Sequence, residues 1–209
     1  MKSSLTAKSK KALFVGLLRG INVSGRNLIP MAELRSLCED LKWKGVQTYI
    51  QSGNLIFATD GAPAEIERQL EQSITKRFGH SVPAIVRAAS DWPSYIKTNP
   101  MAEACKISAK SVMLVLSKNP PKPDAEQALQ ERAVNGERVL AAGNALWIHF
   151  ADGVATSKLS PALLDRLIGS TATARNWNTV LKINELIDSA RKEIDQPLVS
   201  SGPKSKGSR

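Results

Sequence analysis

Two hairpin-like stretches constrain the fold most, because they place the same turn at an equivalent point of two successive units. The sequences YIQSGNLIFA (49–58) and LAAGNALWIHF (140–150) both set Gly-Asn between β-prone runs, and this pair is common in turns between antiparallel strands. Each stretch follows a predicted strand and helix and precedes another helix. We therefore expect two similar units, produced either by a true duplication or by hairpin chemistry alone.

The first unit begins with an unbroken apolar run, ALFVGLL (12–18), which predicts a strand buried on both faces. Pro30 suits the first turn of a helix, and a second helix begins at Pro63 with apolar residues every four positions. The hairpin strands lie between these helices, and VPAIV (82–86) closes the unit as a strand. This order of elements, βαββαβ, is that of the ferredoxin-like, or split βαβ, arrangement.

The second unit begins at about residue 111 and runs through the strand VMLVL (112–116), a helix, and the hairpin strands ERVLA and ALWIHF. Ser160 and Pro161 then open a helix, and a last helix runs from about Asn176 to about Ala190. The predicted fold class is α+β, with two ferredoxin-like (βαββαβ-type) subdomains that have antiparallel sheets.

The same pattern predicts the domain boundaries. We expect subdomain 1 at residues 12–88, a linker with a short helix at 89–110, and subdomain 2 with a C-terminal helix at 111–194. Flexible basic tails are predicted at 1–11 and 195–209, because these segments are rich in Ser, Lys, Gly and Pro and cannot bury a core.

The tails carry most of the formal net charge of +10. Residues 1–11 contain four lysines and no acid, and residues 195–209 contribute a further +2, which leaves +4 for the rest of the chain. The predicted folded part is therefore only mildly basic, which favours an anionic ligand in general and no particular one.

Apolar runs of at most seven residues are far too short to cross a bilayer, and the first residues lack an apolar signal region. The two cysteines are too few for a disulfide framework. We therefore expect a cytoplasmic protein without a membrane partner.

The sequence RGINVSGRN (19–27) places charged and amide side chains directly after the first predicted strand. A right-handed crossover makes the first two strands run in the same direction, so their C-terminal ends share one edge of the sheet. That edge would bring together the polar side chains of the loop and of the next hairpin, namely Arg19, Asn22, Arg26, Asn27, Ser52 and Asn54. With the amides of the helix that opens at Pro30, these residues predict a site for a phosphate- or carboxylate-bearing ligand.

A structural interpretation of the same loop stands beside this one. Gly20 and Gly25 can supply backbone angles closed to other residues, and Asn22, Asn27 and Asn54 can cap turns with their side chains. Should Arg19 be held in an internal salt bridge, the predicted pocket is lost.

A second unusual stretch, ARNWNTV (174–180), places Trp177 between two asparagines at a helix start. In the structural interpretation Asn176 or Thr173 is the N-cap and the tryptophan packs inward. In the functional one, Arg175 and Asn178 face the Arg19 edge across the subdomain boundary.

Three segments together, RGINVSGRNLIPMAEL, YIQSGNLIF and ARNWNTVLKI, resemble the family catalogued as domain of unknown function 1697. The likeness covers about residues 13–186. It implies a small cytoplasmic bacterial protein of α+β fold with ferredoxin-like subdomains, and it implies no activity because the family has none assigned.

The resemblance also implies a set of recurrent polar positions: Arg19, Asn22, Asn27, Ser52, Asn54, Arg175, Asn176 and Asn178. One departure is that Ser24-Gly25 stands where the family usually has Gly-Gly. If the first of those glycines must adopt a positive φ, Ser24 alters the detailed shape of the loop.

Motifs for catalysis are missing from the sequence. There is no Gly-rich phosphate loop and no dinucleotide fingerprint, and His80 and His149 each stand alone, which favours core or surface roles over metal binding. Cys38 lies on an apolar helix strip, and Cys105 lies in the linker with no histidine near it in sequence. We expect no metal and no cofactor, and the sequence leaves open whether the chain is an enzyme.

Two alternatives to a small-ligand site follow from the fold class. Ferredoxin-like sheets host RNA-recognition domains, which stack bases on aromatic residues of their middle strands, here Phe14 and Phe57. The predicted burial of the first strand opposes that mode, whereas the basic tails favour nucleic-acid binding independent of sequence. A regulatory or dimerisation module without catalysis fits the fold equally well, and the sequence leaves the oligomeric state open.

Overall fold

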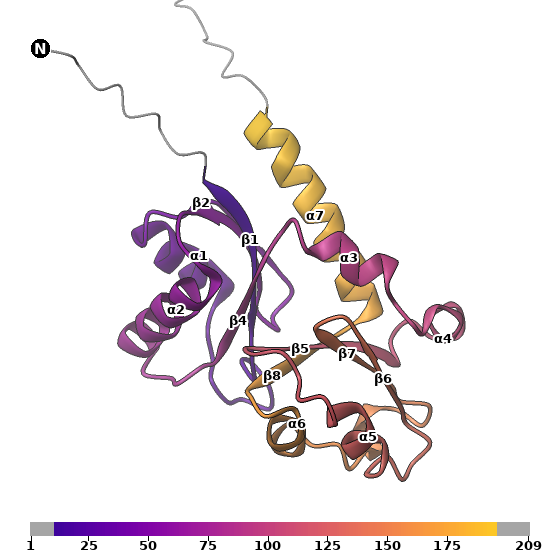
Figure 1. Ribbon diagram of the computed structural model, residues 1–209. Helices are drawn as coiled ribbons and strands as arrows, with labels where there is room; N and C mark the ends of the chain where they lie inside the picture. The colour runs from indigo at the N-terminus through magenta and orange to yellow at the C-terminus, as the bar shows by residue number, and fades with distance from the viewer. Residues whose placement is uncertain (1–10, 196–209) are drawn as a thin grey trace, which may run out of the picture.

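The computed structural model describes residues 11–195, which form two four-stranded antiparallel sheets with their helices (Figure 1). The strands of the first sheet are β1 (Ala12–Leu18), β2 (Lys44–Tyr49), β3 (Asn54–Thr59) and β4 (Ala84–Ala88), in the order β2-β3-β1-β4. Helix α1 (Met31–Asp40) connects β1 to β2, and α2 (Pro63–Phe78) connects β3 to β4. The predicted βαββαβ unit is confirmed.

The second sheet repeats this topology. Its strands are β5 (Val112–Ser117), β6 (Arg138–Ala142), β7 (Ala145–His149) and β8 (Ala172–Asn176), in the order β6-β7-β5-β8. Helix α5 (Ala125–Gln130) lies between β5 and β6, while a short 3-10 turn (Val154–Thr156) and α6 (Pro161–Ile168) lie between β7 and β8. Each half of the chain thus forms one ferredoxin-like subdomain, and the predicted α+β fold class is confirmed.

Strand β8 corrects the sequence-based assignment, which placed a helix start in this region and no strand before it. Its five residues, ATARN, carry only small and polar side chains and show no apolar run. Their backbone pairs with β5 in antiparallel register, from Met113 opposite Asn176 to Ser117 opposite Ala172. A long-range partner strand, which local propensity cannot reveal, therefore fixes this segment as β.

Helices cover the outer face of each sheet. In the first subdomain α1 and α2 pack Leu34, Cys38, Leu70 and other apolar residues against the sheet. In the second, α5 and α6 do the same through residues such as Leu129 and Ile168. The predicted packing role of Cys38 is confirmed, because its side chain is fully buried.

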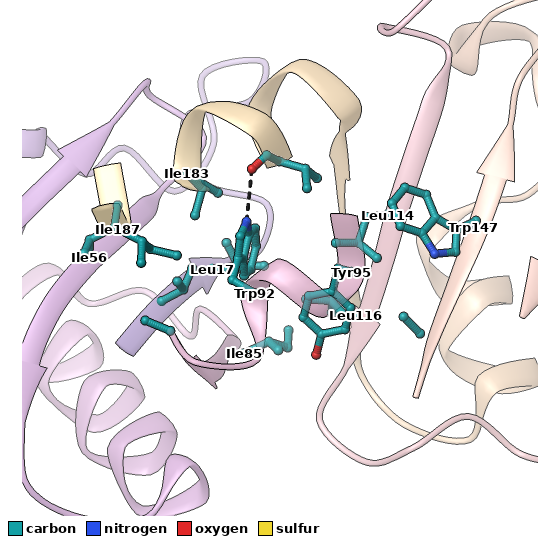
Figure 2. Close-up of a cluster of buried hydrophobic side chains, with 14 of the residues drawn as sticks. Leu17, Ile56, Ile85, Trp92, Tyr95, Leu114, Leu116, Trp147, Ile183 and Ile187 are labelled. Atoms are coloured by element: carbon teal, nitrogen blue, oxygen red, sulfur yellow. Dashed lines mark hydrogen bonds between the residues drawn. The ribbon is translucent and has the colours of Figure 1, made fainter. Parts of the chain in front are cut away.

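The inner faces of the two sheets meet in a third core (Figure 2). Two helices fill the space between the sheets: α3 (Trp92–Lys97), in the linker, and α7 (Trp177–Asp195), which follows β8. The buried indole of Trp92 donates a hydrogen bond from Nε1 to the carbonyl oxygen of Val180, 3.0 Å away. Helix α7 thereby joins the two subdomains, and it extends beyond the predicted end at Ala190.

The linker contains the short helix expected near Trp92 and a second one, α4 (Ala102–Ile107), that the sequence does not predict. Almost all of each predicted tail, residues 1–10 and 196–209, lies outside the described residues. Within residues 11–195, no helix combines the length and the apolar character needed to span a bilayer.

Candidate functional site

The two polar turns singled out by the sequence meet at one edge of the first sheet. The side chain of Asn22 donates from Nδ2 to the carbonyl oxygen of Gln51, 2.9 Å away, and to that of Ile29 at 3.0 Å. Its Oδ1 accepts a hydrogen bond from the amide of Ile29 at 2.9 Å. The predicted convergence is confirmed, and we call the surface formed by residues 19–30 and 50–54 the turn edge.

Uncommon backbone conformations concentrate at the turn edge. Outside glycine, five described residues have a positive φ, and four of them lie here: Asn22, Ser24, Asn27 and Ile50. Asparagine tolerates this region, whereas a β-branched residue such as Ile50 is strained there. Asn27 also donates from Nδ2 to the carbonyl oxygen of Gly20 at 3.0 Å. The asparagines therefore hold the loop in a fixed shape, as the structural interpretation expects.

Arg19 is paired within the protein. Its Nη1 lies 2.7 Å and 2.6 Å from the two carboxylate oxygens of Asp165, on α6 of the other subdomain. This is the internal salt bridge that, by the sequence argument, removes the predicted pocket around Arg19. It engages one nitrogen, however, and the Nε and Nη2 groups of Arg19 have no partner among residues 11–195. The guanidinium is partly exposed.

The side chain of Arg175 extends from β8 of the second sheet to the turn edge and is buried there. Its Nε donates to Oδ1 of Asn54 at 2.6 Å. Its remaining donors reach main-chain and hydroxyl oxygens of Leu18, Ser52, Gly53, Thr173 and Ala174. The predicted proximity of Arg175 to the Arg19 edge is confirmed. Each of its nitrogens is engaged within the protein, so direct ligand binding by Arg175 stays a prediction that would require these bonds to be exchanged.

The charge of Arg175 has no acidic partner among the described residues. Every oxygen that it contacts belongs to a carbonyl, an amide or a hydroxyl group. Burial lowers the pKa of Arg175 to about 10, so the guanidinium stays protonated at neutral pH. The positive charge of Arg175, which no described acid neutralises, therefore lies against the turn that carries Ser52.

Asn54 and Ser52 belong to this internal network. Asn54 is fully buried, and it donates from Nδ2 to the carbonyl oxygen of Tyr49 at 3.0 Å and to Oγ of Ser52 at 3.1 Å. The buried amide therefore connects the hairpin turn to Arg175 of the second sheet, and it is inaccessible to a ligand.

The other predicted site residues have diverse roles. Asn176 accepts from the amide of Thr179 at 2.9 Å, which confirms it as the cap of α7, whereas Thr173 lies in β8. Trp177 is half-buried and packs near Trp147, with ring centroids 5.6 Å apart. Asn178 and Arg26 are exposed, and neither side chain contacts a partner in the described part of the chain.

Sequence reasoning missed Asp165, which the structure places opposite Arg19. Its Oδ1 also accepts from the amide of Ala172 at 2.9 Å and so orients the start of β8. Within PALLDRLI an acid at this position is typical of a solvent-facing helix residue. No local signal marks it, because its partners come from the other subdomain and from a later strand.

A family model described as "Protein of unknown function (DUF1697)" matches residues 12–147, well over half of the chain. The chain belongs to this family. The resemblance read from the three sequence segments is therefore confirmed. No curated protein matches the chain, so the comparisons add no activity to the DUF1697 assignment.

A solved structure supports the fold of this DUF1697 member. The conserved bacterial protein SP0830 from Streptococcus pneumoniae superimposes with a TM-score of 0.66 at 22% sequence identity. The match covers 84% of this chain and 98% of the other. At this identity the likeness concerns the arrangement of the two ferredoxin-like subdomains alone.

Ser24, at the position where the resemblance implied a glycine, adopts a φ of 49°. The position thus has the left-handed backbone that favours glycine. Ser24 is exposed, so the loop keeps this conformation at an energetic cost and without a buried clash.

The thiols of this DUF1697 protein are poor nucleophiles. Burial raises the pKa of Cys38 to about 12, and burial also raises the pKa of Cys105. A thiolate, the reactive form, is therefore scarce at both positions. Residues 11–195 also contain no cluster of three or more acidic, histidine or cysteine side chains placed to hold a metal ion.

The aromatic residues required for base stacking are inaccessible. Phe14 and Phe57 are buried beneath α1 and α2, with Phe57 stacked on Trp43. The opposite face of the same sheet is covered by α3 and α7. The described residues therefore offer no sheet surface for stacking in the manner of an RNA-recognition domain.

Proposed function

We propose that this protein binds a small anionic ligand, one that carries a phosphate or carboxylate group, at the turn edge. The observation that supports this most directly is the buried guanidinium of Arg175, whose charge no acidic side chain of residues 11–195 neutralises. Uncompensated buried charge is costly, and its field is weakly screened by the surrounding protein. An anion seated above the turn would offset part of that cost.

Groups able to contact such an anion lie on the rim. Arg26 is exposed and has no internal partner in the described chain, and Arg19 keeps Nε and Nη2 for a ligand. Helix α1 begins just beyond the loop, at Met31, and no side chain of residues 11–195 caps its N-terminus. Its first amides are therefore available to an anion, while Asn22 and Asn54 hold the rim in place.

An exposed arginine without a partner offers a clean test. Arg26→Ala should abolish the thermal stabilisation produced by inorganic phosphate or citrate and should leave the melting temperature of the free protein unchanged. Arg68→Ala, which removes an exposed arginine from α2, is the matched control. Equal ligand-induced shifts in the two variants would refute the proposal.

A second candidate is the regulatory or dimerisation module. Val23, Leu28 and Ile50 are 57%, 60% and 47% exposed and all belong to the turn edge. Apolar side chains grouped on a rigid surface are typical of protein contacts. Sedimentation of the wild type and of Leu28→Ser over a range of concentrations separates the candidates, because self-association lost in Leu28→Ser favours the module.

A further inference from the structure

A concave surface lies in the second subdomain, and none of the turn-edge residues lines it. It is a recess of about 280 Å³ between the linker and the ends of β6 and β7, lined by Asn99, Met101, Glu103, Arg138 and His149 among others. Helix α4 stands beside these strands at some distance from α7 (Figure 1). Small-molecule pockets usually exceed about 300 Å³, so a recess of this size suits a compact ligand.

Two basic side chains face the recess together. Arg138 and His149 are directly opposite each other in the β6–β7 register, so their Cβ atoms lie about 5 Å apart on the same face of the sheet. That face is the inner one, because Trp147, two residues before His149, packs into the core between the sheets. Neither the guanidinium nor the imidazole has a hydrogen-bond partner among residues 11–195.

The wall opposite these strands is held by internal bonds. Oδ1 of Asn99 accepts from the amide of Met101 at 2.8 Å, and its Nδ2 contacts Sγ of Cys105 at 3.3 Å. Met101 is buried and supplies an apolar surface. The recess is therefore formed before a ligand arrives, with one apolar wall and one basic wall.

The surrounding charges favour an anion. Glu103, the acid on the rim, is paired with Lys106 at 2.7 Å, which reduces its repulsion of a negative ligand. On its other side, His149 lines a second recess of about 440 Å³ together with Lys110. Apart from His149, the charged side chains that line the two recesses are therefore Arg138, Lys110 and Glu103.

We propose that this recess is a binding site for a compact oxyanion, a phosphate monoester or a carboxylate with a small apolar group. Arg138 grips two oxygens of the anion through its planar fork, and His149 completes the contact. The apolar part of the ligand lies against Met101. The site is separate from the turn edge and does not depend on the function proposed there.

Amide chemical shifts of the isotope-labelled full-length protein test the two sites independently in one titration. Phenyl phosphate should shift the amides of residues 99–104, 138 and 149 in a saturable manner. Inorganic phosphate, which lacks the apolar group, should bind there at least threefold more weakly. Residues 20–29 and 51–53 report the turn edge separately, so failure at either site is recognised without reference to the other.

Three variants decide whether the recess itself binds. Arg138→Ala should weaken phenyl phosphate at the recess at least tenfold, whereas the control Arg68→Ala, at an exposed position on α2, should leave this affinity unchanged. Glu103→Gln should strengthen binding two- to fivefold, a gain that structural damage does not produce. Unchanged affinity in Arg138→Ala, or shifts without saturation, would show an adventitious contact and overturn the proposal.

Discussion

Arg175 and Asn54 lie 121 positions apart in sequence, yet the Nε of the arginine donates to Oδ1 of the asparagine at 2.6 Å. Both residues are buried, and each belongs to a different sheet. This contact therefore links the two ferredoxin-like subdomains at the turn edge.

Replacement of Asn54 by alanine tests the strength of this contact. The variant removes the acceptor of the Arg175 Nε and the side-chain bond to the carbonyl oxygen of Tyr49, so the free energy of unfolding should fall by about 2–4 kcal/mol. Urea denaturation measures the change. Asn178→Ala, at an exposed position, should stay within about 0.5 kcal/mol of the wild type, and equal effects of the two changes would contradict the assignment.

Replacement of Arg175 by lysine should not preserve stability, although it keeps the charge. An ammonium group has no planar fork and cannot reach the oxygens of Asn54, Leu18 and Thr173 together. We expect a loss of about 3–5 kcal/mol, as for other broken buried charge networks. Chemical denaturation gives the value. A loss below 1 kcal/mol would show that charge alone matters at this position.

The two Gly-Asn turns should respond differently to the same substitution. A Cβ on Gly53 would lie 2.7 Å from Cβ of Leu18 and 2.7 Å from Cδ1 of Ile21, whereas no atom of the described chain lies within 4 Å of one on Gly143. Both glycines have a positive φ, so backbone strain is common to both. Gly53→Ala should cost about 2–4 kcal/mol, by strain and overpacking.

Gly143→Ala serves as the matched control, with an expected cost of about 1 kcal/mol from the backbone alone. Thermal denaturation of both variants gives the comparison. Equal losses would mean that the close approach of the first turn to Leu18 is relieved without cost.

Glu67 gives the protein a predictable pH dependence. Its carboxyl group is buried against β4, and this burial raises its pKa above the usual value of 4.5, although the amide of Val86 and the charges of Lys118 and Arg87 oppose the shift. A carboxyl group with a raised folded-state pKa stabilises the fold below its unfolded pKa. That contribution is lost as the pH rises through the folded-state value.

Glu67→Gln removes this titration while retaining an oxygen for the amide of Val86, 2.8 Å away. The stability of the variant relative to the wild type should therefore increase between pH 4 and pH 7. Urea denaturation at both pH values measures the difference, and Glu193→Gln, at an exposed position, should show no such trend. If the stability of Glu67→Gln relative to the wild type fell as the pH rises, the pKa of Glu67 would be lowered in the folded protein, not raised.

The sequence by itself determined the order of elements in the first half and, apart from strand β8, in the second. Apolar periodicity, the prolines that open helices and the Gly-Asn turns are local signals, and they depend on residues within a few positions of one another. The same signals placed loop 19–30 and the first hairpin turn at one edge, because crossover handedness leaves little choice.

Only the tertiary structure decided which polar groups are engaged. Arg175, Asp165 and Asn54 find their partners more than 100 positions away, and no pattern in neighbouring residues encodes such pairings. The identical Gly-Asn turns have different surroundings for the same reason: Asn54 is buried beside a cation, whereas Asn144 is exposed. The burial of a residue depends on which distant segments the fold packs against it. Local sequence patterns therefore predict the elements, whereas only the tertiary structure shows which side chains are buried and paired.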